Sequence, residues 1–248
     1  MDLPVHDPDV VITPFFFEQT VLLSLLAGIL AVDDRAGWQS LLAHPVFASL
    51  LVAAIAGSWE AALYTGVALE LVWISILPMR GTRRPDTTTG GVVGVGTVCL
   101  ILRHTADPRV AFIIATGVAM GLIAGEAAGI AGRFFNRIRE HRLGKFKAPE
   151  GAGLGAVTCR LTVYHYLSVS YHAITSVILT FAGLSVSVAL SDRLTATISP
   201  ALVTGSSWWL YVLPVIGAAG LAQNFWHKHL NRFLVLSAGI VLVILWIR

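Results

Sequence analysis

The chain has 248 residues, of which 56% are hydrophobic and 12% are charged, and its mean hydropathy is +0.76. This composition is far more apolar than that of a soluble domain and predicts a membrane protein. Apolar stretches recur from end to end and leave no room for a soluble domain of ordinary size. We therefore predict a single all-α polytopic membrane domain over residues 1–248, with a small net charge of +3.

The first predicted span covers residues 15–31 and begins after Pro14, a favourable position for a helix start. Two later apolar segments, residues 46–57 and 90–102, are shorter than the roughly 20 residues that cross a bilayer. Glycine, proline or polar residues bound both of them. Backbone that ends at membrane depth must be covered by protein or line a cavity. We therefore predict a helix bundle with re-entrant half-spans around a site.

A predicted helix over residues 61–77 carries Glu70 inside an apolar run. An intramembrane carboxylate persists mainly where it faces a cavity, a partner or a substrate. At helical spacing Glu70 shares a face with Gly66, Trp73 and Leu77. A carboxylate beside an indole suits a polyol, because the carboxylate accepts bonds from hydroxyls and the indole covers an apolar sugar face. The alternative is a structural Glu70 bonded to backbone at a broken helix.

Pro85 and Asp86 follow a turn rich in arginine. Pro85 prevents a regular helical continuation through Arg84, and Asp86 can cap the half-span that follows. The amides of that helix end would then lie near the Glu70 pocket. Asp86 is thus either a cap that matters for folding or a second group of the site.

The next predicted helix covers residues 110–131 and repeats glycine every four residues at positions 117, 121, 125 and 129. Such a stripe of small residues lets membrane helices approach closely. Six basic residues then follow against one Glu140: Arg133, Arg137, Arg139, Arg142, Lys145 and Lys147. By the positive-inside rule we predict a basic cytoplasmic loop over residues 132–156. Its position between hydrophobic blocks argues against a nucleic-acid partner.

The second helical half covers residues 157–248 and opens with a helical run from Thr158 through Leu190. We find no nucleophile elbow, Walker loop or HExxH helix, and we predict no catalytic residue, cofactor or metal site. His165 and His172 lack an acidic partner at metal spacing and are interpreted as structural or interface histidines. Cys99 and Cys159 are interpreted as reduced packing residues.

The stretch from His44 to Gly91 resembles the signature region of the IIC subunits of the mannose/fructose/sorbose family of sugar phosphotransferase systems. That family commonly shows an Arg-Pro step, a Gly-Asp pair, a Gly-x-x-Leu-Glu-Leu-x-Trp helix, and a Pro-x-x-Gly followed by Pro-Asp or Pro-Asn. These motifs fall here on His44-Pro45, Gly57-Ser58, Gly66 to Trp73, Pro78 to Gly81, and Pro85-Asp86. The resemblance is strongest over residues 20–131. We call residues 15–131 the signature half.

The resemblance implies a sugar-translocating subunit of the bacterial inner membrane that works by alternating access and pairs with a IID membrane subunit. It implies that the cytoplasmic IIA and IIB proteins carry the phosphoryl group, so that this chain is not an enzyme by itself. It further suggests a homo-oligomer of IIC–IID pairs. The implied sugar-site residues are Glu70 and Asp86, with Trp73 beside them, and Asp34 and Gln39 at lower rank.

Three departures from the family pattern affect the expected sugar specificity more than the fold. His44 replaces the usual Arg, Ser58 replaces the usual Asp, and the turn is basic, with Arg80, Arg83 and Arg84. The alternatives are a degenerate IIC-like protein with a sensing or regulatory role, and an unrelated membrane scaffold or channel with a structural Glu70.

Overall fold

Six α-helices and one short 3-10 helix make up the main part of the chain described by this computed structural model. It describes residues 14–35, 40–74, 85–104, 110–144 and 154–197, and the single positions 208, 212, 215 and 219. The elements are α1 (Pro14–Arg35), η1 (Leu41–Ala43), α2 (Pro45–Ala56), α3 (Trp59–Ile74), α4 (Thr87–His104), α5 (Val110–Gly144) and α6 (Leu154–Thr197). These ranges contain no strand, so the all-α prediction is confirmed.

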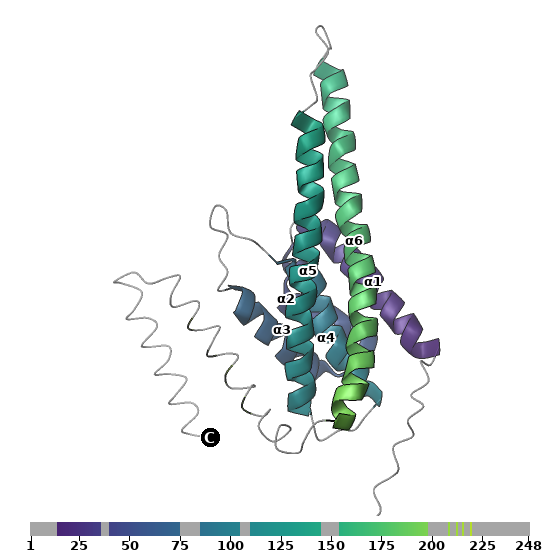
Figure 1. Cartoon of the computed structure of the whole chain (residues 1–248), viewed down its shortest axis with the longest axis vertical. Coiled ribbons are helices and arrows are strands. Elements are labelled where there is room, and N and C mark those ends of the chain that lie inside the picture. The colour runs from purple at the N-terminus through teal and green to yellow at the C-terminus, as the bar shows by residue number, and fades with distance from the viewer. Residues whose placement is uncertain are drawn as a thin grey trace, which may run out of the picture.

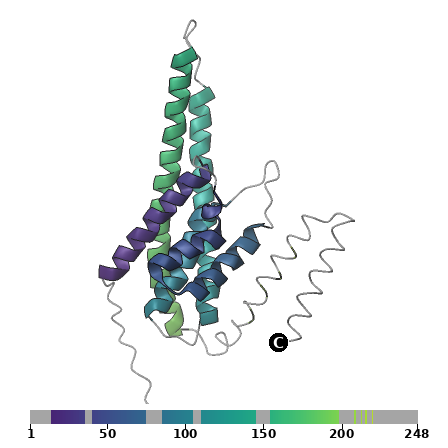
Figure 2. The same cartoon turned by 180° about the vertical axis from the view of Figure 1, so that it is seen from behind.

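Helix α4 forms the centre of the bundle. It packs against α1, α2, α3, α5 and α6, and every residue from Thr88 to Leu100 is buried. Helices α2, α3 and α4 lie together beside the lower part of the α5–α6 pair (Figures 1 and 2). A continuous apolar run is what a helix with neighbours on all sides requires.

The glycines of α4 and α5 allow these two helices to pack with their backbones in near contact. A Cβ atom built on Gly94 would lie 2.8 Å from the carbonyl oxygen of Gly117, and one on Gly121 would lie 2.7 Å from that of Gly90. Neither carbonyl could move without shifting a helix. The predicted role of the glycine stripe as a close-packing surface is confirmed at Gly117 and Gly121.

The short first segment is also confirmed. Helix α2 has 12 residues, which at about 1.5 Å per residue is about 18 Å. Pro45 occupies its first turn, and Gly57 ends it. The second segment begins earlier than predicted, because α4 starts at Thr87 and reaches 18 residues.

The predicted end at residue 131 of the helix that starts at residue 110 is wrong, because α5 continues to Gly144. It takes in residues 132–144 of the predicted basic loop. Helix α6 likewise begins at Leu154, before the predicted Thr158. The two helices support each other beyond the central cluster: the rings of Phe135 and Tyr171 stack with centroids 3.6 Å apart. Residues 133–143 contain neither glycine nor proline, so nothing local ends the helix there.

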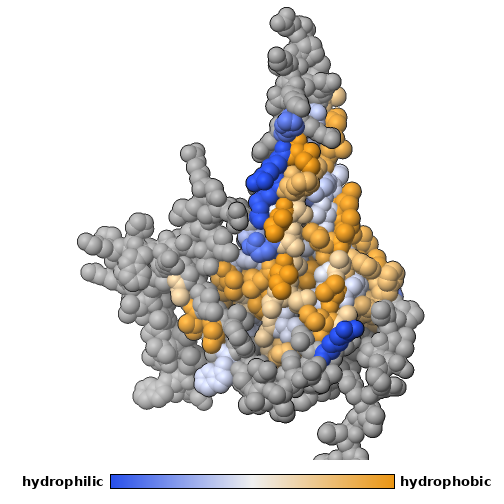
Figure 3. Space-filling model, in the orientation of Figure 1, coloured by the Kyte–Doolittle hydropathy of each residue, from blue (hydrophilic) through white to orange (hydrophobic). Residues whose placement is uncertain are grey.

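Three helices in the described part of the chain are long and apolar enough to cross a membrane: Phe15–Asp34, Val110–Ile138 and Leu161–Leu190. Their exposed positions include large apolar side chains such as Ile123 and Phe134 on α5 and Ile178 on α6. Figure 3 shows this apolar surface over α5 and α6, with hydrophilic residues gathered on the upper part of α5. An apolar outer surface is what helices in contact with lipid require.

Candidate functional site

Glu70 lies near the end of α3 and faces the start of α2. Its Oε1 atom lies 2.9 Å from Nδ1 of His44, and its side chain is 20% exposed. Its Oε2 atom is buried and has no hydrogen-bond partner among the described residues. A buried carboxylate oxygen without a donor is costly. The arrangement therefore leaves one strong acceptor available for a hydroxyl.

Two features of the sequence bring Glu70 to His44. Gly66, one turn before Glu70, allows α3 to approach α2, since a Cβ atom there would lie 2.6 Å from Cβ of Ser49 and 2.8 Å from the carbonyl oxygen of Pro45. His44 is the N-cap residue of α2, but its side chain does not cap the helix. The imidazole is instead free to reach Glu70.

Asp86 caps α4. Its Oδ1 atom accepts a bond of 2.9 Å from the amide of Thr89, and its own amide donates to the carbonyl of Gly125 at 2.9 Å. The predicted capping role of Asp86 is thus confirmed. The cap also places Asp86 at the junction of α4 and α5, where a Cβ atom on Gly125 would lie 3.1 Å from the Asp86 carbonyl oxygen.

Trp73 lies at the same junction and is 7% exposed. A Cβ atom on Gly90 would lie 2.6 Å from its Cη2 atom, and one on Gly125 would lie 3.0 Å from its Cζ2 atom. The end of the indole therefore fits against glycines of α4 and α5. In this structure Trp73 helps to pack α3 against the α4–α5 junction, where Asp86 also lies.

The two lower-ranked residues lie near the end of α1. Asp34 is exposed there, and Gln39 lies outside the described residues. The neighbouring Asp33 accepts a bond of 2.6 Å from the hydroxyl of Ser40. Since η1 and His44 follow Ser40 closely, this bond ties the end of α1 to the segment that leads into the Glu70 corner.

The residue that sequence reasoning missed as a partner of Glu70 is His44. The available signal was a polar residue directly before Pro45 at the start of a short apolar helix. The pairing itself spans 26 positions. Of the other two departures from the family pattern, Ser58 lies at the opposite end of α2 from His44. The turn with Arg80, Arg83 and Arg84 lies outside the described residues.

The remaining candidate residues lie elsewhere. His172 is buried and packs edge-on against Phe135 and Tyr171, while His165 is exposed. Across the described ranges, no three His, Cys, Asp or Glu side chains come together as a metal site. His44 and Glu70 contact each other, and Pro45, next to His44, packs on Gly91 of α4, the helix that Asp86 caps. We call this region the Glu70 corner.

The fold and this corner define a helical membrane protein with a carboxylate held beside a buried, glycine-rich helix. The model of the family described as "PTS system sorbose-specific iic component" matches residues 17–246, and the chain belongs to this family. It is therefore a IIC permease component of a sugar phosphotransferase system.

One curated relative is "Putative N-acetylgalactosamine permease IIC component 2" of Escherichia coli (strain K12), which is 29% identical over 113 residues. That alignment covers 46% of this chain and 73% of the relative. It agrees with the family match in indicating a IIC permease component.

Two solved structures share the fold. The first, described as "Structure of membrane protein", has a TM-score of 0.61 and 19% identity and covers 95% of this chain and 96% of its own. The second, "CryoEM Structure of Mannose Transporter ManYZ and Microcin E492 (MceA) complex", has a TM-score of 0.50 and 18% identity, with coverage of 93% and 94%.

Proposed function

We propose that this IIC component binds its sugar at the corner formed by Glu70, His44 and the capped start of α4, with Glu70 as the principal hydroxyl acceptor. The observation that carries the proposal is the buried Oε2 atom of Glu70, which has no donor among the described residues. An ionised carboxylate accepts hydrogen bonds only, and sugar hydroxyls are donors that fit it. A permease also needs a polar group at membrane depth, where one is otherwise costly.

Asp86 is the second proposed sugar contact, and Trp73, Asp34 and Gln39 complete the proposed set at lower rank. Oδ1 of Asp86 accepts the bond from the amide of Thr89 that caps α4, and the cap fixes the carboxylate at the start of that helix. Trp73, on the same helix as Glu70, is proposed to border the pocket at the α4–α5 junction, against which it packs.

The chain is proposed to work with a IID membrane subunit in the bacterial inner membrane, as a multi-pass protein and in an oligomer of IIC–IID pairs. Cytoplasmic IIA and IIB proteins are proposed to carry the phosphoryl group, while this chain supplies the site and the path. Support comes from the family match and from the likeness of the fold to that in the mannose transporter ManYZ complex. The sorbose, N-acetylgalactosamine and mannose in the names of the family and its relatives are all polyols.

The test replaces Glu70 with Gln in the complex purified with its IID partner. Glu70→Gln keeps the volume and one acceptor oxygen but removes the charge, so charge-assisted bonds of about 1.5 to 3 kcal/mol fall toward ordinary strength. We expect the affinity for sorbose, N-acetylgalactosamine or mannose to fall about tenfold or more. Affinity is measured by calorimetry and stability by thermal unfolding.

The matched control is Glu60→Gln, the same change at an exposed glutamate in the first turn of the same helix. It should leave both affinity and melting temperature unchanged. A well-folded Glu70→Gln complex with wild-type affinity would remove Glu70 from the site. A fall in melting temperature with normal affinity would assign it a structural role.

A further inference from the structure

We propose that one exposed face of α5, formed by Phe134, Arg137, Ile138 and His141, binds the phosphate headgroup of an anionic phospholipid. We call these four residues the basic face. The basic face begins about 13 Å along α5 from Gly125, whose carbonyl accepts the amide hydrogen of Asp86. It is therefore separate from the proposed sugar site and does not depend on it.

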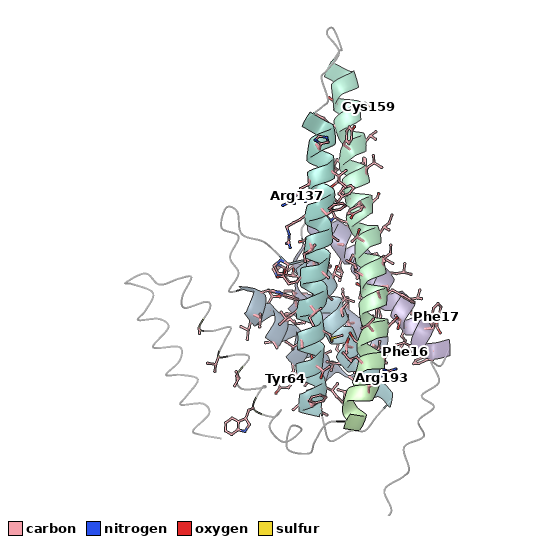
Figure 4. All side chains as sticks on the ribbon, in the orientation of Figure 1. Phe16, Phe17, Tyr64, Arg137, Cys159 and Arg193 are labelled. Atoms are coloured by element: carbon pink, nitrogen blue, oxygen red, sulfur yellow. The ribbon has the colours of Figure 1, made fainter. Side chains whose placement is uncertain are left out.

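The four residues of the basic face share one side of α5. Their positions differ by three or four, which is about one helical turn, and all four are exposed. Arg137 forms no hydrogen bond or ion pair with another described residue, and it points away from α6 (Figure 4). Helix α6 covers another side of the same segment, where Phe135 stacks on Tyr171. The basic face thus has no neighbour on α6.

Two large apolar side chains place the basic face in the membrane. Phe134 is 66% exposed and Ile138 is 39% exposed, and both lie within the stretch of α5 that is long and apolar enough to cross a membrane. They continue the exposed apolar surface that Ile123 and Ile130 form on the same helix. Exposed apolar surface of this kind marks contact with a membrane or with another protein. Its continuity with the spanning stretch favours lipid over a soluble acidic protein.

Tyrosines on α6 mark the level of the lipid headgroups. Tyr171 stacks on Phe135, and Tyr164 and Tyr166 precede Tyr171 on α6, toward the basic end of the helix pair. Tyr166 is exposed. Tyrosine gathers at the boundary between membrane and water, because its ring suits the acyl chains and its hydroxyl suits the headgroups. A long arginine side chain at this level extends its charged end to the phosphates while its stem stays among apolar groups.

The charge of the segment also suits a phosphate. Residues 133–147 contain six Lys or Arg residues and one Glu. The guanidinium of Arg137 is always charged, and its planar fork of donors matches two phosphate oxygens. The nearest acidic residue of α5 with a described side chain is Glu126, about 16 Å along the helix. Figure 3 shows the hydrophilic residues of α5 directly beside the apolar surface of the helix pair, which is the pairing that a phospholipid presents.

The experiment titrates the purified full-length protein in neutral detergent with phosphatidylglycerol and, separately, with phosphatidylcholine that has the same acyl chains. Native mass spectrometry measures the affinity for each lipid. We expect the wild type to bind phosphatidylglycerol more tightly. Arg137→Gln should weaken that binding about fivefold, which corresponds to about 1 kcal/mol for one basic residue at a membrane surface. It should leave the binding of phosphatidylcholine unchanged.

Two further variants separate the position of the charge from its amount. Arg193→Gln is the matched control, because it removes the same charge from an exposed arginine at the opposite end of α6 (Figure 4). It should keep the wild-type affinity for phosphatidylglycerol. Arg137→Lys keeps the charge at the basic face and should retain more of the affinity than Arg137→Gln does, with only the planar fork lost.

The outcomes decide as follows. Equal affinity of the wild type for the two lipids overturns the proposal and leaves the basic face for an acidic protein. An equal loss in Arg137→Gln and Arg193→Gln also overturns it, because the effect would then come from net charge. Complete displacement of phosphatidylglycerol by excess inorganic phosphate would assign the face to free phosphate instead. Thermal unfolding checks that each variant is folded, and the preference of the wild type decides without any variant.

Discussion

The hydroxyls of Thr89 and Ser176 lie 2.8 Å apart although 87 positions separate them in the chain. Ser176 also donates to the carbonyl of Ala27 at 3.2 Å, so one side chain of α6 joins α1 and α4. Ala27, Thr89 and Ser176 are all buried. The contact fixes the second helical half against the signature half.

We expect Ser176→Ala to lower stability by about 1 kcal/mol, because it removes both bonds and leaves buried polar groups without this partner. Thermal unfolding in detergent measures the change. Ser170→Ala is the control, since Ser170 is exposed on the same helix. Equal melting temperatures for the two variants would show that the junction adds no stability.

Gly94 should not tolerate alanine. The new methyl group would lie 2.8 Å from the carbonyl oxygen of Gly117 and 2.8 Å from Cδ1 of Leu69, and the carbonyl belongs to a packed helix. We expect Gly94→Ala to destabilise by about 1 to 3 kcal/mol or more. Gly132→Ala is the control, because its methyl group would meet only His172, at an ordinary 3.4 Å. A Gly94→Ala protein as stable as this control would contradict the close approach of α4 and α5.

The turn between α2 and α3 depends on backbone conformation. Gly57 has φ 85° and ψ −160°, a region that only glycine adopts readily, and Ser58 has φ 58°. Gly57→Ala should therefore destabilise by about 1 to 3 kcal/mol, although a Cβ atom there meets nothing within 4 Å. Ser58→Gly should stabilise by about 1 kcal/mol, because it relieves a left-handed residue with a side chain. If Gly57→Ala and Ser58→Gly shifted the melting temperature in the same direction, the backbone conformation of this turn would not explain their effects.

Asp86 can be tested for its two roles separately. Asp86→Asn keeps an oxygen that can cap α4 but removes the charge, whereas Asp86→Ala removes both. We expect Asp86→Ala to lose about 1 kcal/mol of stability and Asp86→Asn to lose little. If Asp86 also binds sugar, both variants lose affinity. Normal affinity in a stable Asp86→Asn protein would leave Asp86 as a cap alone.

The basic end of α5 is predicted to face the cytoplasm. Arg137 is exposed and points away from α6 (Figure 4), and Val110 is exposed at the other end of the same helix, about 40 Å away at the rise of an α-helix. In a background without Cys99 and Cys159, a cysteine at position 137 should resist an impermeant thiol reagent in intact cells. A cysteine at position 110 should react more readily. Rapid labelling at position 137 would invert the predicted topology.

Local features of the sequence determined the class of the protein and several of its elements. The apolar runs predicted an all-α membrane protein, Pro45 and Gly57 bound a short helix, and Asp86 caps the next one. Each of these features depends on residues that are close together in the sequence. Membrane insertion depends on one continuous apolar run, and helix capping and helix termination depend on the residues at the helix end. The motif around Glu70 was sufficient to indicate the family that the comparison confirms.

Only the tertiary structure decided which distant groups meet. The pairing of His44 with Glu70 depends on the close approach of α2 and α3 at Gly66, and the pairing of Thr89 with Ser176 depends on how α4 and α6 meet. Neither can be predicted from local pattern, because each depends on how two helices cross and which faces they turn to each other.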